Sequence, residues 1–439
     1  MKKTTKAFLG WFAILFISLI PVFLWFKLGP EGNAFSDYAS TVHSLGEIFG
    51  LVGMTMFALT FVLSTRIRFI EDVFGGLDKV YIAHGILGGT ALILVLFHPI
   101  LLVLKFIPQN LAQAAIYLLP SSYWSTNFGI MALTGMMALV YLTLFTKMKY
   151  HRWKFTHEFL GLMFFFAVLH IFLVRGQASS DYIFKGYYYY ASIVSFIGLG
   201  AFSYSLFIKK RIFKNAVYTI KDIQREGDTF TLKIVPQHKP INYKSGQFVF
   251  MRFYNKYLSK ETHPFSIASK SNSGVMKIVI KSLGDFTSKL EHLSVGEKVS
   301  LEGPYGRFHF RNYHGKKQVW IAAGIGVTPF LGMVEDLDEM KDPKTEVDFY
   351  HSVKNNNDFV GYDVLSYADK KIKGFRFIPW NSSVRGRLDV EHIQKISGDY
   401  ENTEFFLCGP TGFKESLIHK LIKLGVKKNN IHEEAFDFR

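Results

Sequence analysis

Long apolar runs dominate the first half of the chain and end near residue 210. Six of these runs approach the roughly 20 residues that a helix needs to cross a membrane. We expect membrane helices at Ala7–Leu28, Val42–Leu63, Val80–Leu104, Tyr123–Phe145, Glu158–Val174 and Tyr187–Ile208. No small-residue cleavage site follows the first run, so we do not expect it to be a cleaved signal peptide.

After residue 210 the pattern changes to shorter runs separated by turn residues. Val217–Val235 and Gln247–Phe253 are rich in β-branched and aromatic residues, which predicts strands. From Val319–Ala323 onward, strand-like runs such as Val347–Val353 and Glu404–Leu407 alternate with helix-like segments. This alternation is typical of an α/β fold with a parallel sheet.

Charge placement gives the membrane helices a direction. Basic segments at Lys2–Lys6, Arg66–Arg68, Lys147–Lys154 and Lys209–Arg211 alternate with connections that carry few cations. Because basic loops remain in the cytoplasm, we expect a multi-pass cell-membrane protein with both termini cytoplasmic. Much of the net charge of +16 then faces membrane lipid, and we expect no nucleic-acid partner.

Composition excludes several classes of protein. With 49% hydrophobic residues the chain is too apolar to be disordered. Its one cysteine, Cys408, excludes an intramolecular disulfide and an iron–sulfur cluster held by thiolates. It also excludes the paired-cysteine attachment of a c-type haem.

Four histidines lie in two of the expected membrane helices. His84 and His98 are 14 residues apart, and His157 and His170 are 13 apart. At 1.5 Å per residue each spacing covers roughly 20 Å along a helix. The third and fifth spans run in the same direction, so His84 should be level with His157, and His98 with His170. Two imidazoles at each level are what bis-histidine ligation of two stacked haems requires.

Two other interpretations of these histidines are core packing and a zinc site. Zinc ligands must converge on one point, which two levels roughly 20 Å apart do not allow. A spacing of 13 leaves His170 off the helical face of His157, so we expect either an irregular fifth helix or two histidines that approach from different sides. His43 and Glu47, one turn apart, either line the exposed side of an outer haem or face a neighbouring helix.

Three motifs in the second half carry candidate chemistry. The segment His263–Ser269 follows a strand and lacks a helical period. Gly284–Thr287 precedes an expected helical run, Ser288–Leu293, whose N-terminus would offer N–H groups to a pyrophosphate. The alternative there is an ordinary N-cap by Asp285 or Thr287. In Ala322–Phe330, glycines after a strand permit close backbone approach to phosphates.

On the histidine couples and these motifs, the chain resembles the NADPH oxidase and ferric reductase superfamily. The resemblance implies a six-span helical bundle, then an antiparallel β-barrel FAD domain and an α/β parallel-sheet nicotinamide-nucleotide domain, as in ferredoxin reductases. The implied domains are 1–210, 211–313 and 314–439. The implied cofactors are FAD, NADPH and two b-type haems, with His84 and His157 on the inner iron and His98 and His170 on the outer iron.

The same resemblance assigns the soluble site residues. Those implied to contact FAD are His263, Pro264, Phe265, Ser266, Ser269, Gly284, Thr287 and either Phe436 or Phe438 at the aromatic end. Those implied to contact NADPH are Gly303, Pro304, Gly324, Gly326, Thr328, Pro329, Ser352, Lys354, Arg385, Arg387, Cys408, Gly409 and Pro410. Cys408 would lie beside the reacting carbon; a catalytic thiol is the alternative, but no paired base is visible.

The implied function is electron transfer from cytoplasmic NADPH through FAD and both haems to an outer acceptor, O₂ giving superoxide. A ferric or other metal-chelate reductase shares this path. The short outer loops carry no dense acidic cluster, which disfavours a metal site, whereas Leu102 replaces a histidine found in some oxidase relatives. A haem-bearing scaffold or sensor is a third hypothesis. We expect no obligate protein partner.

Overall fold

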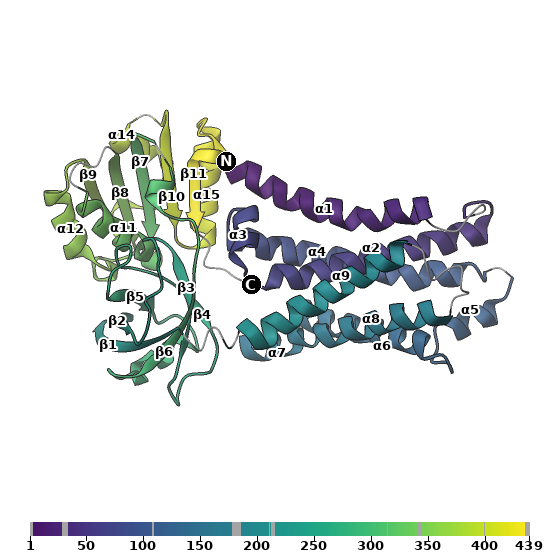
Figure 1. Ribbon diagram of the computed structural model, residues 1–439. Coiled ribbons are helices and arrows are strands. Elements are labelled where there is room, and N and C mark those ends of the chain that lie inside the picture. Colours follow the sequence, from purple (N-terminus) through teal and green to yellow (C-terminus); the bar gives the residue numbers. More distant parts are fainter. Residues whose placement is uncertain are drawn as a thin grey trace. The chain divides into compact units, whose positions relative to one another are not determined.

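The computed structural model describes residues 3–28, 34–107, 109–177, 186–209, 211, 216–313, 315–340, 345–398 and 400–434 (Figure 1). Phe436 and Phe438, the two candidates for the flavin-stacking ring, lie outside these residues. The chain forms two compact units, Thr5–Lys210 and Arg211–Arg439, and the break between them coincides with the change in sequence pattern.

In the described part of the first unit, six segments are long and apolar enough to cross a membrane, as the sequence predicts. They comprise α1 (Lys3–Leu28), α2 (Tyr38–Ser64), α4 (Leu77–Leu104), α6 (Trp124–Phe145), α7 (Tyr150–Glu158) with α8 (Leu160–Gln177), and α9 (Gly186–Ser203) extended by a π-helical turn, η2 (Tyr204–Ile208). Two short helices connect them, α3 (Arg68–Phe74) and α5 (Leu111–Tyr117).

The fifth span is interrupted, as the 13-residue histidine spacing predicts. Helix α7 ends at Glu158 and α8 begins at Leu160, so Phe159 separates the segments that carry His157 and His170. The interruption changes the direction in which the two imidazoles project, because they no longer follow a single helical repeat.

An aromatic cluster fills the middle of the helical unit. The Phe164 ring is fully buried and its centroid lies 5.2 Å from that of Phe57 and 5.0 Å from that of Phe61. Aromatic pairs at such distances contribute roughly 1 kcal/mol beyond the area they bury. Phe164 therefore has a packing role between α2 and α8.

The first sheet of the second unit is antiparallel and curls into a barrel. Its strands are β1 (Val217–Glu226), β2 (Thr229–Pro236), β3 (Phe248–Phe253), β4 (His263–Ser266), β5 (Met276–Lys281) and β6 (Lys298–Tyr305), in the order β4-β3-β6-β1-β2-β5. Just after the first strand in that order, Ile267 forms an antiparallel bridge to Ile278 of the last. This bridge joins the two edges, so the barrel expected from the resemblance is confirmed.

The second sheet is parallel, with the order β11-β10-β7-β8-β9. Its strands are β7 (Lys317–Ala323), β8 (Glu346–Val353), β9 (Phe375–Asn381), β10 (Thr403–Cys408) and β11 (Ile431–Glu434). Its helices are α11 (Thr328–Asp338), α12 (Tyr362–Lys371), α13 (Ser382–Arg385), α14 (Val390–Ser397) and α15 (Thr411–Lys423).

Alternating side chains of the parallel sheet enter two separate cores. On β7, Trp320 packs on the side of α11 and α12, whereas Val319 and Ile321 pack on the side of α14 and α15. A strand apolar on both faces is the signature of a sheet covered by helices on both sides. The α/β architecture predicted from the sequence is therefore confirmed.

Candidate functional site

The structure brings together the two histidine couples that the sequence places at equal depth. The ring centroids of His84 and His157 are 6.0 Å apart, and those of His98 and His170 are 6.3 Å apart. Each couple joins α4 to the fifth span. The two couples lie at different heights along α4, because 14 residues of helix separate His84 from His98 by roughly 20 Å.

Hydrogen bonds orient three of these imidazoles. Nδ1 of His84 lies 2.9 Å from the carbonyl oxygen of Thr60, and Nδ1 of His98 lies 2.8 Å from that of Gly46. Nδ1 of His170 lies 2.7 Å from the carbonyl oxygen of Ser125. A carbonyl only accepts, so Nδ1 carries the proton and Nε2 keeps its lone pair. This arrangement is typical of metal-ligating histidines.

His157 has a weaker partner. Its Nδ1 lies 3.4 Å from the Thr143 hydroxyl, which donates its own proton to the Leu139 carbonyl at 2.8 Å. The hydroxyl therefore accepts from His157, and Nε2 again keeps its lone pair. The Trp153 ring also stacks on the imidazole, with centroids 5.2 Å apart and planes 15° apart. Stacking thus adds to the long hydrogen bond in holding this ring.

Two glycines make room for the outer couple. A Cβ on Gly50 of α2 would lie 2.7 Å from His98 Nδ1, and one on Gly129 of α6 would lie 2.9 Å from His170 Nδ1. Real Cβ atoms do not approach so closely, so each imidazole occupies the space that a side chain would fill. Neither glycine was predicted as part of the site. The only sequence signal for each is an isolated glycine inside an apolar span.

These observations fit haem better than a metal site made by protein alone. An iron held roughly 2 Å from each of two imidazole nitrogens separates the ring centroids by about 6 Å, which matches both couples. In the described part of the chain, no group of three or more His, Cys, Asp or Glu side chains could hold a metal ion. Two imidazole nitrogens at each level would therefore suit the iron of a haem, which brings its other ligands with it.

The structure places Glu47 of this pair against a neighbouring helix. Their side chains are 3.6 Å apart, and Glu47 also accepts a hydrogen bond of 2.9 Å from the indole N–H of Trp25 on α1. Glu47 therefore faces a neighbouring helix. Its partner explains how a carboxylate is accommodated in this apolar segment.

The candidate flavin strand, β4, lies at one edge of the barrel and pairs with β3 through Pro264 and Phe265. The Ser266 hydroxyl is buried without a hydrogen-bond partner among the described residues. A buried hydroxyl without a partner is costly, which indicates a ligand atom that completes it. The polar edge of a flavin ring offers such an atom, so β4 fits the group that the resemblance assigns to it.

Other predicted flavin residues already have partners inside the protein. The His263 ring lies 3.8 Å from that of Phe286, and its Nε2 lies 3.1 Å from Glu261. The Ser269 hydroxyl contacts the Tyr243 hydroxyl at 2.7 Å and accepts from the Lys277 N–H at 3.1 Å. The proposed contacts of His263 and Ser269 with FAD therefore remain predictions.

The helical run expected at Ser288–Leu293 is present as a 3₁₀ segment, Thr287–His292, which is too short to offer an N-terminal anion site. No side chain caps it; instead the Thr287 hydroxyl accepts from the N–H groups of Leu283 and Gly284 at 2.9 and 3.1 Å. The N-cap by Asp285 or Thr287 is therefore corrected, because the Thr287 hydroxyl binds the loop that precedes the segment.

The nucleotide motifs meet where the order of the parallel sheet reverses. β7 lies between β8 and β10, and the loops that follow β7 and β10 leave the sheet at the same edge. Ligands of open α/β sheets bind at the carboxyl ends of strands flanking such a reversal. Gly324 and Gly326 follow β7, and Gly409 and Pro410 follow β10, so the chain brings the predicted residues together.

Glycine is required for these two loops to touch. A Cβ on Gly326 would lie 2.3 Å from the Cys408 carbonyl oxygen, and one on Gly409 would lie 2.8 Å from Ala323 Cβ. Helix α11 begins directly afterwards, with Thr328 buried and Pro329 in its first turn. The loop is therefore held against β10 by its backbone.

The end of the barrel reaches the same region. Gly303 and Pro304 lie in β6, next to Tyr305, which pairs with Phe248 of β3. A Cβ on Gly306 would lie 3.5 Å from a carboxylate oxygen of Glu434, at the end of β11. The predicted flavin and nicotinamide residues thus come from neighbouring parts of one compact unit.

Residues predicted to select NADPH lie at or after the carboxyl ends of β8 and β9. Ser352 is near the end of β8, and Lys354 follows it; the Lys354 carbonyl accepts from the Ser383 hydroxyl of α13 at 2.6 Å. The Arg385 guanidinium lies 5.4 Å from the centroid of the Trp380 ring. Lys354 and α13 therefore lie together, whereas Arg387 contacts the Gly412 carbonyl at the start of α15.

His351 was not found from the sequence. It is fully buried, and its Nε2–H donates to the Gly324 carbonyl at 3.0 Å. Burial lowers the pKa of His351 to about 4, so the ring is neutral near pH 7. Gly324 has a φ of +53°, so His351 helps to hold a loop conformation that glycine adopts readily.

We expect Cys408 to resist alkylation while the protein is folded. Its side chain is fully buried, and burial raises the pKa of the thiol well above its usual value, so it is not a reactive thiolate. Iodoacetamide at pH 8 should label Cys408 only after denaturation, as followed by mass spectrometry. Rapid labelling of the native protein would instead support the catalytic-thiol alternative.

Three family profiles match the chain in succession. Residues 49–168 match "Ferric reductase like transmembrane component", residues 212–309 match "FAD-binding domain", and residues 320–418 match "Oxidoreductase NAD-binding domain". The transmembrane match contains His84, His98 and His157. The profiles therefore follow the same order as the helical bundle, the barrel and the parallel sheet.

Curated relatives align with about half of the chain. The reductase component of propane 2-monooxygenase from Mycolicibacterium smegmatis is 28% identical over 48% of this chain and 64% of its own length. The phenol hydroxylase P5 protein of Acinetobacter pittii is 26% identical over 51% of this chain and 65% of its own length. The chain thus spans less than two thirds of either relative.

Among solved structures, the flavohemoglobin of Malassezia yamatoensis with bound FAD and heme is 16% identical, with a TM-score of 0.49 over 91% of this chain and 97% of that one. The class of protein follows from the profiles and the geometry above: an oxidoreductase module with FAD- and NAD-binding domains, joined to a ferric reductase-like membrane domain. These three domains in this order are the domain architecture of the NADPH oxidase and ferric reductase superfamily.

Proposed function

We propose that this protein moves electrons across the cell membrane, from cytoplasmic NADPH through FAD and two b-type haems to O₂ on the outer side, giving superoxide. The observation that carries the proposal is the pair of histidine couples with ring centroids 6.0 and 6.3 Å apart. Their Nε2 atoms keep their lone pairs, and the same chain carries the flavin and nucleotide domains.

The cofactors supply hydride acceptance and one-electron transfer, while the protein supplies position. The loop at Gly324–Val327 and the turn after Cys408 hold the nucleotide against the barrel end. Ser266 donates or accepts a hydrogen bond at the flavin. The four histidines would hold the two haem irons, one couple of imidazoles at each level of the helical unit.

The proposed direction of transfer follows from charge. Basic connections such as Lys147–Lys154 and Lys209–Arg211 mark the cytoplasmic side by the positive-inside rule. His84 and His157 are then the inner couple, and His98 and His170 the outer couple. We propose that membrane lipid is the main partner of the helical unit, and that neither an obligate protein partner nor nucleic acid is required.

One observation favours reduction of a ferric chelate as a second candidate function. Leu102, one turn beyond His98 on α4, fits against Gly46, where a Cβ would lie 3.0 Å from Leu102 Cδ2. An apolar side chain therefore lies next to the outer couple, at the position where some oxidase relatives carry a histidine. The electron path is the same for both acceptors.

The acceptor is tested with purified protein loaded with haem and FAD. NADPH is added, and reduction of cytochrome c is compared with and without superoxide dismutase, alongside reduction of a ferric chelate. The proposal expects dismutase to suppress most of the cytochrome c reduction. Fast chelate reduction with no effect of dismutase would favour the second candidate. Haem absorbance that does not change with NADPH under anaerobic conditions would favour a scaffold or sensor.

A further inference from the structure

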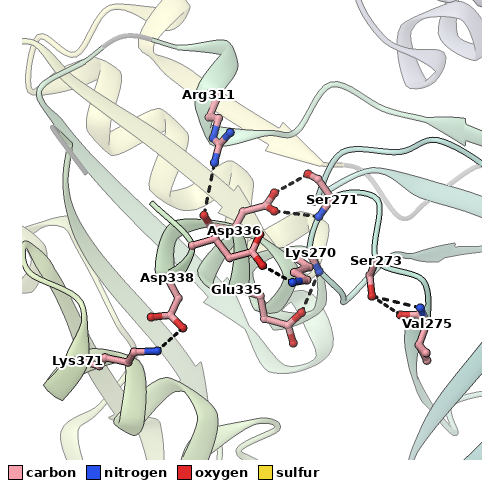
Figure 2. A network of polar contacts seen from close by, with 10 residues as sticks. Lys270, Ser271, Ser273, Val275, Arg311, Glu335, Asp336, Asp338 and Lys371 are labelled. Atoms are coloured by element: carbon pink, nitrogen blue, oxygen red, sulfur yellow. Dashed lines mark hydrogen bonds and ion pairs between the residues drawn. The ribbon is translucent and has the colours of Figure 1, made fainter. Parts of the chain in front are cut away.

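Helix α11 contacts both parts of the soluble unit through opposite ends. Its first residue, Thr328, follows the nucleotide loop Gly324–Val327 directly. Its last turns face the barrel loop Lys270–Ser273, which comes a few residues after the flavin strand β4 (Figure 2). One short, rigid helix therefore links the element expected to hold the nicotinamide nucleotide to the element expected to hold the flavin.

Both carboxylate oxygens of Asp336 accept hydrogen bonds from this barrel loop. One oxygen accepts from the Ser271 N–H at 2.9 Å and the other from the Ser271 hydroxyl at 2.6 Å. The residue is only 4% exposed, so these hydrogen bonds take the place of contacts with water. Hydrogen bonds to a carboxylate are short and roughly twice as strong as neutral ones.

Neighbouring groups strengthen this contact between α11 and the barrel loop. Glu335 accepts from the Lys270 N–H at 2.9 Å and pairs with the Lys277 ammonium at 2.8 Å. The Ser271 hydroxyl in turn accepts from the Ser245 N–H at 3.0 Å, which links the loop back into the barrel. Glu335 therefore adds two bonds between α11 and the barrel, and the Ser271 loop is itself anchored within the barrel.

The helix also approaches the loop without any intervening side chain. A Cβ on Gly332 of α11 would lie 2.4 Å from the Ser269 carbonyl oxygen. The backbones are thus in contact at Gly332 and are held one turn later by Asp336. Such a contact has one well-defined geometry, because close-packed interiors tolerate little displacement.

We propose that Asp336 is a positioning residue for hydride transfer, which sets the distance between the nicotinamide and the flavin by holding α11 to the Ser271 loop. The proposal rests on the proposed function, in which NADPH gives up a hydride and the flavin accepts it. Asp336 touches neither reactant. It acts through Ser271 and through the helix that carries the nucleotide loop.

Replacing Asp336 by alanine should slow the hydride step more than it weakens nucleotide binding. Reacting atoms must lie about 3–3.5 Å apart, and a displacement of about 1 Å costs on the order of 100-fold in rate. We expect the stopped-flow rate of flavin reduction at saturating NADPH to fall about 10- to 100-fold. The NADPH concentration for half-saturation should change less than about threefold, since the nucleotide loop itself is intact.

Asp338 provides a matched control on the same helix. Its carboxylate pairs with Lys371 at 2.7 Å, inside the α/β domain and away from the barrel loop (Figure 2). The change Asp338→Ala removes the same kind of charge from α11 and should leave flavin reduction unchanged. Ser271→Ala should reproduce most of the Asp336→Ala defect, and Ser271→Thr, which keeps the hydroxyl, should restore the rate.

A double-mutant cycle separates positioning from general damage. If Asp336 and Ser271 act as one contact, the double alanine variant should be no slower than Asp336→Ala alone. The proposal would be overturned if the two single-variant losses in rate multiplied in the double variant. It would also be overturned if Asp336→Ala changed only the NADPH concentration for half-saturation and not the rate of flavin reduction. If Asp336→Ala fails to bind FAD, the Ser271 pair decides the same question. Failure of the unmodified holoenzyme to reduce its flavin with NADPH would refute the proposed function instead.

Discussion

Replacing His84 by alanine is expected to remove the inner haem and stop electron flow beyond the flavin. The imidazole supplies one of the two nitrogens at its level, and its ring lies 6.0 Å from that of His157. Haem content per protein should fall by half in a pyridine haemochrome assay. Under anaerobic conditions NADPH should still bleach the flavin at the unmodified rate, while the remaining outer haem stays oxidised.

His43 is the matched control for this experiment. It lies in the same helical unit and is held beside Glu47 rather than opposite another imidazole. The change His43→Ala should keep both haems and their reduction by NADPH. Unchanged haem content in His84→Ala would contradict the bis-histidine assignment. Loss of both haems would be resolved by His98→Ala, which should remove only the outer one.

The change Gly326→Ala is expected to abolish most NADPH-dependent reduction while FAD and haem remain bound. The new Cβ would lie 2.3 Å from the carbonyl oxygen and 2.6 Å from the carbonyl carbon of Cys408. Both are backbone atoms, so the two nucleotide loops must separate. A separation of about 1 Å lowers the rate on the order of 100-fold. Steady-state NADPH oxidation and the flavin and haem spectra measure this directly.

Gly274 shows whether such an effect is specific. A Cβ built there meets nothing within 4 Å, so Gly274→Ala adds the same methyl group to the same unit without a clash. It should retain the rate and the thermal stability of the unmodified protein. If Gly326→Ala also retained full activity, the close contact between the loops after β7 and β10 would have no role in binding the nucleotide.

Local patterns in the sequence are enough to predict the depth of the four histidines and the residues that form the sheets. The constant rise of an α-helix is enough to place His84 level with His157, and helical periodicity also predicts the irregular fifth span. The run expected at Ser288–Leu293 is helical but is a 3₁₀ segment, Thr287–His292, that no side chain caps. The N–H groups of Leu283 and Gly284 donate to the Thr287 hydroxyl, a local arrangement that the helical pattern does not specify.

Short-range periodicity and chain order are sufficient to specify the apolar helical half, the strand-rich and α/β patterns that follow it, and the depth of the four histidines, whereas the resemblance implies the domain identities and the strand that carries Ser266. They do not specify which carbonyl accepts a hydrogen bond from each imidazole, or that the backbone at Gly326 contacts the Cys408 carbonyl. They also do not specify that Asp336 accepts hydrogen bonds from Ser271. The partners in these contacts are separated by 52 residues between His98 and Gly46, and by 65 between Ser271 and Asp336. The packing of elements that are distant in sequence brings such partners together, and local patterns along the chain do not predict this packing.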